Sequence, residues 1–209
     1  MKTLGIAGGI GPESTIEYYR QIVAGYRNRR PDGSYPPILI NSIDLQKLPA
    51  LIAANDLDAV TGYLHGAIAR LSRAGADFVV LASNTPHIVL DELYARAAIP
   101  LISIVEATCE AARHRGLRRL GLFGTRFTMQ GRFYPDVFRR EGIALVAPNQ
   151  EEQDYIHDRY LGELVQGIIR PETREAILAI VDRMRVRDSI DGLTTAIAGY
   201  HFWTPPLFT

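Results

Sequence analysis

Cysteine is almost absent from this sequence, since Cys109 is the only one among 209 residues. An internal disulfide is therefore excluded, and a reducing compartment such as the cytoplasm is expected. No apolar run is long enough to span a bilayer, and the N-terminus lacks the regions of a signal peptide. The 23 basic side chains equal the 23 acidic ones, so no surplus charge favours nucleic acid or an anionic membrane. The five histidines lack the spacing of metal ligands, and we expect no metal site.

The composition, 47% hydrophobic and 22% charged, is that of a globular protein, and the length allows one large domain or two small ones. Strands are expected at residues 4–7, 38–42, 78–82, 100–104, 119–123, 144–146 and 192–198. Helices are expected at residues 14–29, 56–74, 86–97, 105–115, 129–141, 154–167 and 172–186, the first capped by Ser14 or Thr15 with Glu17 in its first turn. Residues 124–128 and 148–152 are expected to be loops. Strands that alternate with helices predict an α/β fold with parallel sheets.

One stretch, FVVLASNTPH at residues 78–87, is the most informative. Its apolar run is typical of a strand buried on both faces, and Pro86 suits the first turn of a helix. Ser83, Asn84 and Thr85 would then lie at a helix N-terminus, where free N–H groups and the helix dipole attract a carboxylate. The alternative is that Asn84 and Thr85 only cap the helix.

The layout of the first half recurs in the second. The strand at 4–7 with its glycine loop is similar to the strand at 119–123 with residues 124–128, and 78–83 is similar to 192–200. Two similar α/β lobes would give this pattern. Ligands of such sheets bind beyond the carboxyl ends of the strands, so the loops at Gly9, Ser83, Thr125 and Tyr200 are expected to line a site.

Four ordered motifs carry a resemblance to a known family: MKTLGIAGGIGPESTIEYY at the start, NSIDL at 41–45, RAGADFVVLASNTPH at 73–87, and GLFGTRFTM at 121–129 followed by FY. The chain resembles the aspartate/glutamate racemase superfamily from Met1 to about Ala198, and most closely its aspartate racemase branch. The resemblance implies two pseudo-symmetric lobes, residues 1–104 and 105–209, with the active-site cleft between them. It also implies a homodimer, a small carboxylic or amino acid substrate, and no cofactor such as pyridoxal phosphate.

In that family, two cysteines face each other across the substrate α-carbon, one removing the proton and the other returning it. The matching positions here are Ser83 and, after Gly199, Tyr200, so both expected cysteines are replaced. Cys109 lies outside both motifs and is interpreted as a small buried apolar residue. The family's substrate-binding positions correspond to Ile10, Asn84, Thr85, Thr125 and Thr128. Family members continue with an apolar segment and a final helix, whereas this sequence ends at Thr209.

The candidate catalytic residues are accordingly Ser83, Tyr200 and His201. A serine hydroxyl needs an adjacent base, and His87 lies one helical turn away, although we interpret His87 as a structural residue or one that acts through its neighbours. His201 could act as a general acid or base, the alternative being a surface histidine. Tyr200 would be a better acid than base, because an unperturbed tyrosine pKa is near ~10.

Three functions remain open on these residues. The first is a racemase or epimerase acting on aspartate or glutamate by α-proton transfer. The second is a lyase, decarboxylase or isomerase of a related acid, since one fold serves several reactions. The third is an inactive homologue that binds a carboxylate. A dinucleotide site at Gly9 and Gly11 is disfavoured, because Ser14 replaces the third glycine and Pro12 interrupts the loop.

Overall fold

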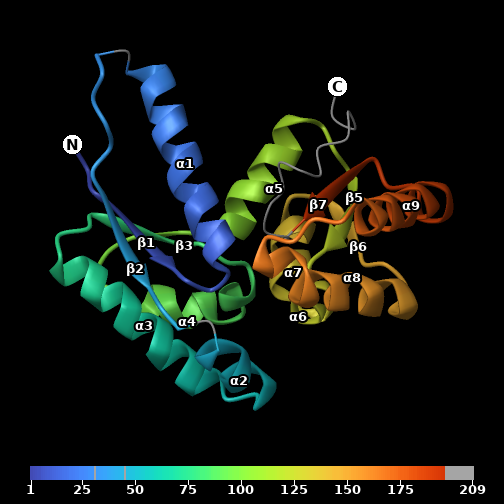
Figure 1. Cartoon of the computed structure of the whole chain (residues 1–209), viewed down its shortest axis with the longest axis horizontal. Coiled ribbons are helices and arrows are strands. Elements are labelled where there is room, and N and C mark those ends of the chain that lie inside the picture. The colour runs from blue at the N-terminus through green and yellow to red at the C-terminus, as the bar shows by residue number, and fades with distance from the viewer. Residues whose placement is uncertain (31, 45, 196–209) are drawn as a thin grey trace. The chain divides into compact units, whose positions relative to one another are not determined.

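The computed structural model describes residues 1–30, 32–44 and 46–195. Contacts divide the chain into two compact units, Met1–Ile104 and Val105–Thr209. Each unit contains a parallel sheet flanked by helices (Figure 1). The predicted α/β class is thereby confirmed.

The first unit is built on a four-stranded parallel sheet of order β2-β1-β3-β4. Its elements are β1 (Leu4–Gly8), α1 (Pro12–Arg29), β2 (Ile38–Ser42), α2 (Lys47–Ala53), α3 (Leu57–Arg73), β3 (Phe78–Leu81), the 3₁₀ helix η1 (Thr85–Val89), α4 (Leu90–Arg96) and β4 (Leu101–Ile102). The two interior strands, β1 and β3, therefore end at the same edge of the sheet.

Alternating side chains of these strands build two apolar layers. On one face, Leu4 and Ile6 pack with Tyr18 and Ile22 of α1. On the other face, Val79 and Leu81 belong to a larger cluster to which α2, α3 and α4 contribute. Figure 1 shows α1 over one face of this sheet and α3 over the other. Because side chains in a strand alternate with period two, burial on both faces explains the unbroken apolar runs in the sequence.

The second unit contains a three-stranded parallel sheet of order β6-β5-β7. Its elements are α5 (Ile104–His114), β5 (Arg119–Phe123), α6 (Arg126–Gln130), α7 (Phe133–Arg140), β6 (Ala144–Val146), α8 (Gln150–Gly162), the 3₁₀ helix η2 (Leu164–Gln166), α9 (Pro171–Asp188) and β7 (Gly192–Thr195). Phe123 packs with side chains of α8 and α9, such as Ile156 and Met184. Cys109 of α5 is 2% exposed, which confirms its interpretation as a buried apolar residue.

The two units share a detail at the start of their central strands. In the first, the Thr3 N–H donates to the Asp77 carboxylate (2.6 Å), and the Asp77 N–H donates to the Thr3 carbonyl (2.8 Å). In the second, the Arg119 N–H donates to the Asp191 carboxylate (3.0 Å), and the Asp191 N–H donates to the Arg119 carbonyl (2.8 Å). In both units an aspartate before the later strand thus fixes its register against the earlier strand.

Several predicted boundaries were wrong. Ser14 and Thr15 do not cap α1, since the helix begins at Pro12 after Gly11. Glu17 lies beyond the first turn and pairs with Arg20 (2.7 Å). The predicted helix at 129–141 is instead two helices, α6 and α7. The predicted loops are shorter than expected, because the last residues of 124–128 belong to α6 and the last residues of 148–152 belong to α8. Helix α2 was not predicted, and the last strand is described only as far as Thr195.

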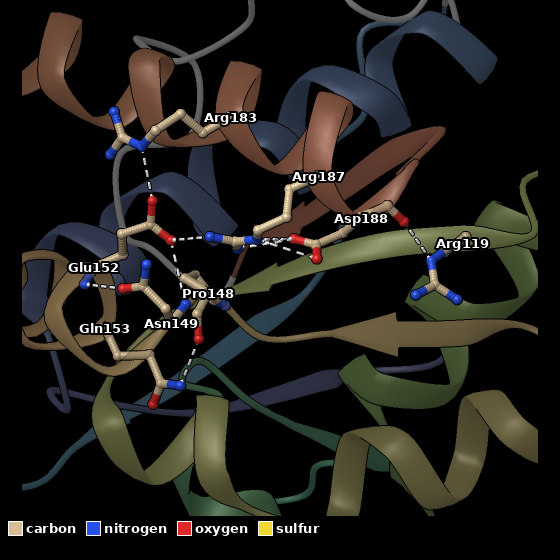
Figure 2. A network of polar contacts seen from close by, with 8 residues as sticks. All are labelled: Arg119, Pro148, Asn149, Glu152, Gln153, Arg183, Arg187 and Asp188. Atoms are coloured by element: carbon tan, nitrogen blue, oxygen red, sulfur yellow. Dashed lines mark hydrogen bonds and ion pairs between the residues drawn. The ribbon is translucent and has the colours of Figure 1, made fainter.

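A buried carboxylate fixes the start of α8, directly after β6. Asn149 and Glu152 form a capping box, in which each side chain accepts the other residue's N–H. Glu152 also binds Arg183 (2.8 Å) and Arg187 (3.3 Å) of α9, as Figure 2 shows. Burial raises the pKa of Glu152, but the hydrogen bonds from Arg183 and the Asn149 N–H outweigh it and hold that pKa below its usual value. The network joins α9 to the chain that leaves β6.

Candidate active site

The glycine loop after β1 is closed by Thr15 of α1. The Gly9 N–H donates to Thr15 Oγ1 (2.9 Å), and the Ile43 N–H donates to the Gly8 carbonyl (2.9 Å). Gly9 has φ +87°, and a Cβ there would lie 2.3 Å from the Ile43 carbonyl oxygen. The loop is therefore packed against the chain that follows β2, and this close backbone approach requires glycine at position 9.

Three predicted site residues lie together where β3 ends. Ser83, Asn84 and Thr85 are half-buried and lead from β3 into η1, with Pro86 in the first turn as predicted. Asn84 provides no side-chain cap for η1, so the interpretation of Asn84 as a capping residue was wrong. The neighbouring candidate Ile10 is 7% exposed and belongs to the apolar cluster of the first unit.

His87 is buried beside this segment and uses both ring nitrogens. Its Nδ1 lies 3.2 Å from the Asn84 carbonyl oxygen, and its Nε2 lies 3.2 Å from the Ile104 nitrogen. Burial lowers the pKa of His87 to about 4, against opposing hydrogen bonds with the backbone of Asn84 and Ser83. The ring is therefore neutral at pH 7. It is not free to act as the base for Ser83.

The low pKa of His87 predicts that stability depends on pH between 6.5 and 4. The folded state binds fewer protons than the unfolded state in this window, so the free energy of unfolding falls as the pH falls. A pKa shift of this size contributes about 3 kcal/mol to the free energy of unfolding. This contribution is present above pH 6.5 and is lost by pH 4. Urea unfolding of the wild type and His87→Gln at pH 7, 6, 5 and 4 measures this. We expect the difference in free energy of unfolding between the two proteins to shrink as the pH falls. If both free energies changed equally with pH, the prediction would be contradicted.

Thr125 and Thr128 form a second cluster, where β5 ends. Thr125 caps α6: its Oγ1 accepts the Thr128 N–H (3.3 Å) and lies 3.1 Å from Thr128 Oγ1. Thr128 is fully buried and Thr125 is 9% exposed. The family resemblance predicted both threonines as substrate-binding residues, and the structure shows that their hydroxyls fix the first turn of α6.

Three polar residues beside this cap were not among the predicted site residues. The Arg126 N–H donates to His157 Nδ1 (3.2 Å), and the Arg126 guanidinium pairs with Asp154 (2.7 Å). Burial, and next the charge of Arg126, lower the pKa of His157. The only sequence signal for this contact is that residues 124–128 and α8 each follow a strand of one sheet.

The remaining candidates, Tyr200 and His201, lie outside the described residues. Within 1–30, 32–44 and 46–195, no three histidine, cysteine, aspartate or glutamate side chains gather as metal ligands. In the same part of the chain, no helix combines the length and apolarity needed to cross a bilayer. The described polar candidates are hydroxyl and amide groups at the carboxyl ends of β3 and β5.

Comparison with known proteins places the chain in a family. The family model for Asp/Glu/hydantoin racemases matches residues 7–200. The broad specificity amino-acid racemase RacX of Bacillus subtilis is 28% identical over 159 residues, which are 72% of this chain and 66% of RacX. A glutamate racemase of Koribacter versatilis is 29% identical over 150 residues, which are 66% of this chain and 51% of that protein. The match thus spans just under two thirds of the first relative and about half of the second.

A solved structure extends the similarity to the fold. An aspartate racemase homologue from Pyrococcus horikoshii is 30% identical, with a TM-score of 0.83, and the match covers 98% of this chain and 89% of that one. The family-model match over residues 7–200 includes Ser83, Asn84, Thr85, Thr125 and Thr128. By sequence and by fold, the chain belongs to the Asp/Glu/hydantoin racemase family.

Proposed function

We propose that the chain is an amino-acid racemase or epimerase that acts by α-proton transfer on a small acidic amino acid such as aspartate or glutamate. The observation that carries this proposal is the family match across residues 7–200, which includes a hydroxyl–amide–hydroxyl segment at the end of an interior strand. The names of the relatives, which include an aspartate racemase homologue and a glutamate racemase, support the acidic substrate class.

The substrate-binding roles go to five residues. Asn84 and Thr85 in the first unit, and Thr125 and Thr128 in the second, are proposed to hydrogen-bond the substrate carboxylates. Ile10 is proposed to supply apolar contact. Amides and hydroxyls can bind a carboxylate without a charge of their own, which suits residues that are half or fully buried.

Proton transfer is assigned to Ser83, Tyr200 and His201. Since both nitrogens of His87 contact the backbone, Ser83 has no activating base there. A serine hydroxyl without such a base is a weak nucleophile and base. We therefore expect slow or one-sided exchange of the α-proton, with Tyr200 or His201 as the second group.

Exchange in D₂O tests the proposal. We expect the wild type to replace the α-proton of L- or D-aspartate or of glutamate by deuterium, as observed by proton NMR. Ser83→Ala should lower this rate by about 10²-fold, the lower range for general acid–base catalysis. Ser34→Ala is the matched control, because the hydrogen bonds of Ser34 among the described residues go to Asp32 in an exposed turn. No exchange in the wild type would contradict the proposal.

Two further measurements identify the alternatives. Release of carbon dioxide or ammonia would indicate a decarboxylase or lyase, and aspartate binding without exchange would indicate an inactive homologue. Hydroxylamine, which removes pyridoxal phosphate, should leave the exchange rate unchanged, because the proposed chemistry uses no cofactor. We infer a homodimer from the family resemblance, a cytoplasmic location from the single cysteine, and no nucleic-acid partner from the balanced charge.

A further inference from the structure

His87 connects two segments that leave neighbouring strands. Strands β3 and β4 pair only through Val79–Leu101 and Val80–Ile102, and β4 has two residues. Beyond these two residue pairs, the imidazole of His87 in η1 accepts the Ile104 N–H and so joins the segments that follow β3 and β4. The ring thus lies between the proposed substrate-binding segment, residues 83–85, and the chain that follows β4.

The geometry determines the tautomer of the ring. The Ile104 N–H can only donate, so Nε2 must accept. In the neutral ring the proton is then on Nδ1, which donates to the Asn84 carbonyl oxygen. The same oxygen also accepts the His87 backbone N–H (3.0 Å). Asn84 is therefore held by two donors of one residue, and its backbone cannot rotate without breaking both.

We propose that His87 is a positioning residue that joins the Asn84 carbonyl to the Ile104 N–H. It thereby fixes Ser83 in the orientation for proton transfer, and Asn84 and Thr85 in the orientation for substrate binding. This inference rests on the proposed function for the identity of the ligand. His87 itself does not touch the substrate or move a proton. His87 is 3% exposed, as expected for a residue that acts through its neighbours.

Three substitutions separate the two contacts. In His87→Asn the amide nitrogen occupies the place of Nδ1 and can donate to Asn84, while the contact with Ile104 is lost. In His87→Gln the side-chain oxygen reaches the place of Nε2 and can accept from Ile104. His87→Phe keeps the volume and removes both contacts. His65→Phe is the matched control, since His65 in the same unit makes one contact with a backbone carbonyl, that of Arg96 (3.1 Å).

The experiment has a structural and a functional readout. Hydrogen exchange should show the Ile104 amide exchanging about tenfold faster in His87→Asn and His87→Phe, and at the wild-type rate in His87→Gln. The KM for aspartate in the deuterium assay should rise about tenfold in His87→Phe, less in His87→Asn and His87→Gln, and not in His65→Phe. A general loss of folding would instead lower the active fraction at unchanged KM.

Two results would overturn the inference: an unchanged Ile104 amide exchange rate in His87→Phe, or an unchanged KM despite faster exchange. If His87→Phe fails to fold, His87→Asn and His87→Gln decide between the same outcomes. If the wild type shows no α-proton exchange, the proposed function fails. In that case aspartate affinity by calorimetry replaces the KM, and the amide measurement still decides whether His87 holds the segment.

Discussion

Replacement of Ser83 and Tyr200 together by cysteine should accelerate α-proton exchange of aspartate by roughly 10²–10⁴-fold over the wild type, the range that a positioned acid–base group contributes. Ser83 follows the interior strand β3 and is half-buried at its carboxyl end. His87 does not serve this hydroxyl as an activating base, because both of its ring nitrogens contact the backbone. A thiol has an unperturbed pKa near ~8.5, so a useful fraction ionises near neutral pH.

The single variants are the controls for this gain. Ser83→Cys alone should accelerate exchange from one enantiomer more than from the other, because one face of the α-carbon would still lack a thiol. Tyr200→Cys alone should show the opposite preference. The pair is chosen from the family resemblance, since Tyr200 lies outside the described residues. A double variant that binds aspartate and exchanges no faster than the wild type would contradict the proton-transfer roles of both positions.

Gly9→Ala should lower the free energy of unfolding by about 4 kcal/mol, the sum of a left-handed backbone conformation and a steric clash. The backbone at Gly9 has φ +87°, which disfavours any side chain. The added Cβ would also lie 2.3 Å from the Ile43 carbonyl oxygen and 2.7 Å from the Ile43 nitrogen. These atoms belong to backbone that is itself bonded to Gly8, so neither can move away cheaply. Urea unfolding measures the effect.

Gly33→Ala separates the two contributions. Gly33 has φ +81°, close to that of Gly9, but a Cβ there meets nothing within 4 Å. We expect Gly33→Ala to cost about 1–2 kcal/mol from backbone conformation alone. The difference between the two variants then isolates the clash at Ile43. Equal costs would show that the glycine loop adapts, and would contradict the close packing of β1 against the chain after β2.

The strands were predictable because burial on both faces leaves a simple signal. Strand β5 and strand β6 were predicted to the residue, and β3 to within one residue, as runs of apolar side chains. Helix α2 was missed because it is short and contains Pro49, which conceals the helical period. The start of α1 was misplaced because Thr15 has the sequence signature of a cap, whereas its hydroxyl accepts from Gly9.

The candidate site was predictable only where its residues are neighbours in sequence. Ser83, Asn84 and Thr85 are consecutive, and Thr125 and Thr128 are three apart on one helical turn. The contacts of His87 with Ile104, and of Arg126 with His157, join residues 17 and 31 positions apart. Such contacts depend on the order of strands in a sheet, and no local pattern in the sequence encodes them.

The order of strands in the second sheet also determines which strand edge is unpaired during synthesis. Strand β5 is interior in its sheet, and its partner β7 is aligned by Asp191, which lies 72 residues after Arg119. At translation rates of about 5–20 residues per second, one edge of β5 stays unpaired for roughly 4–14 s until β7 has been synthesised. Nascent chains of the second unit therefore expose an apolar strand edge during synthesis, and are the species that a chaperone would need to shield.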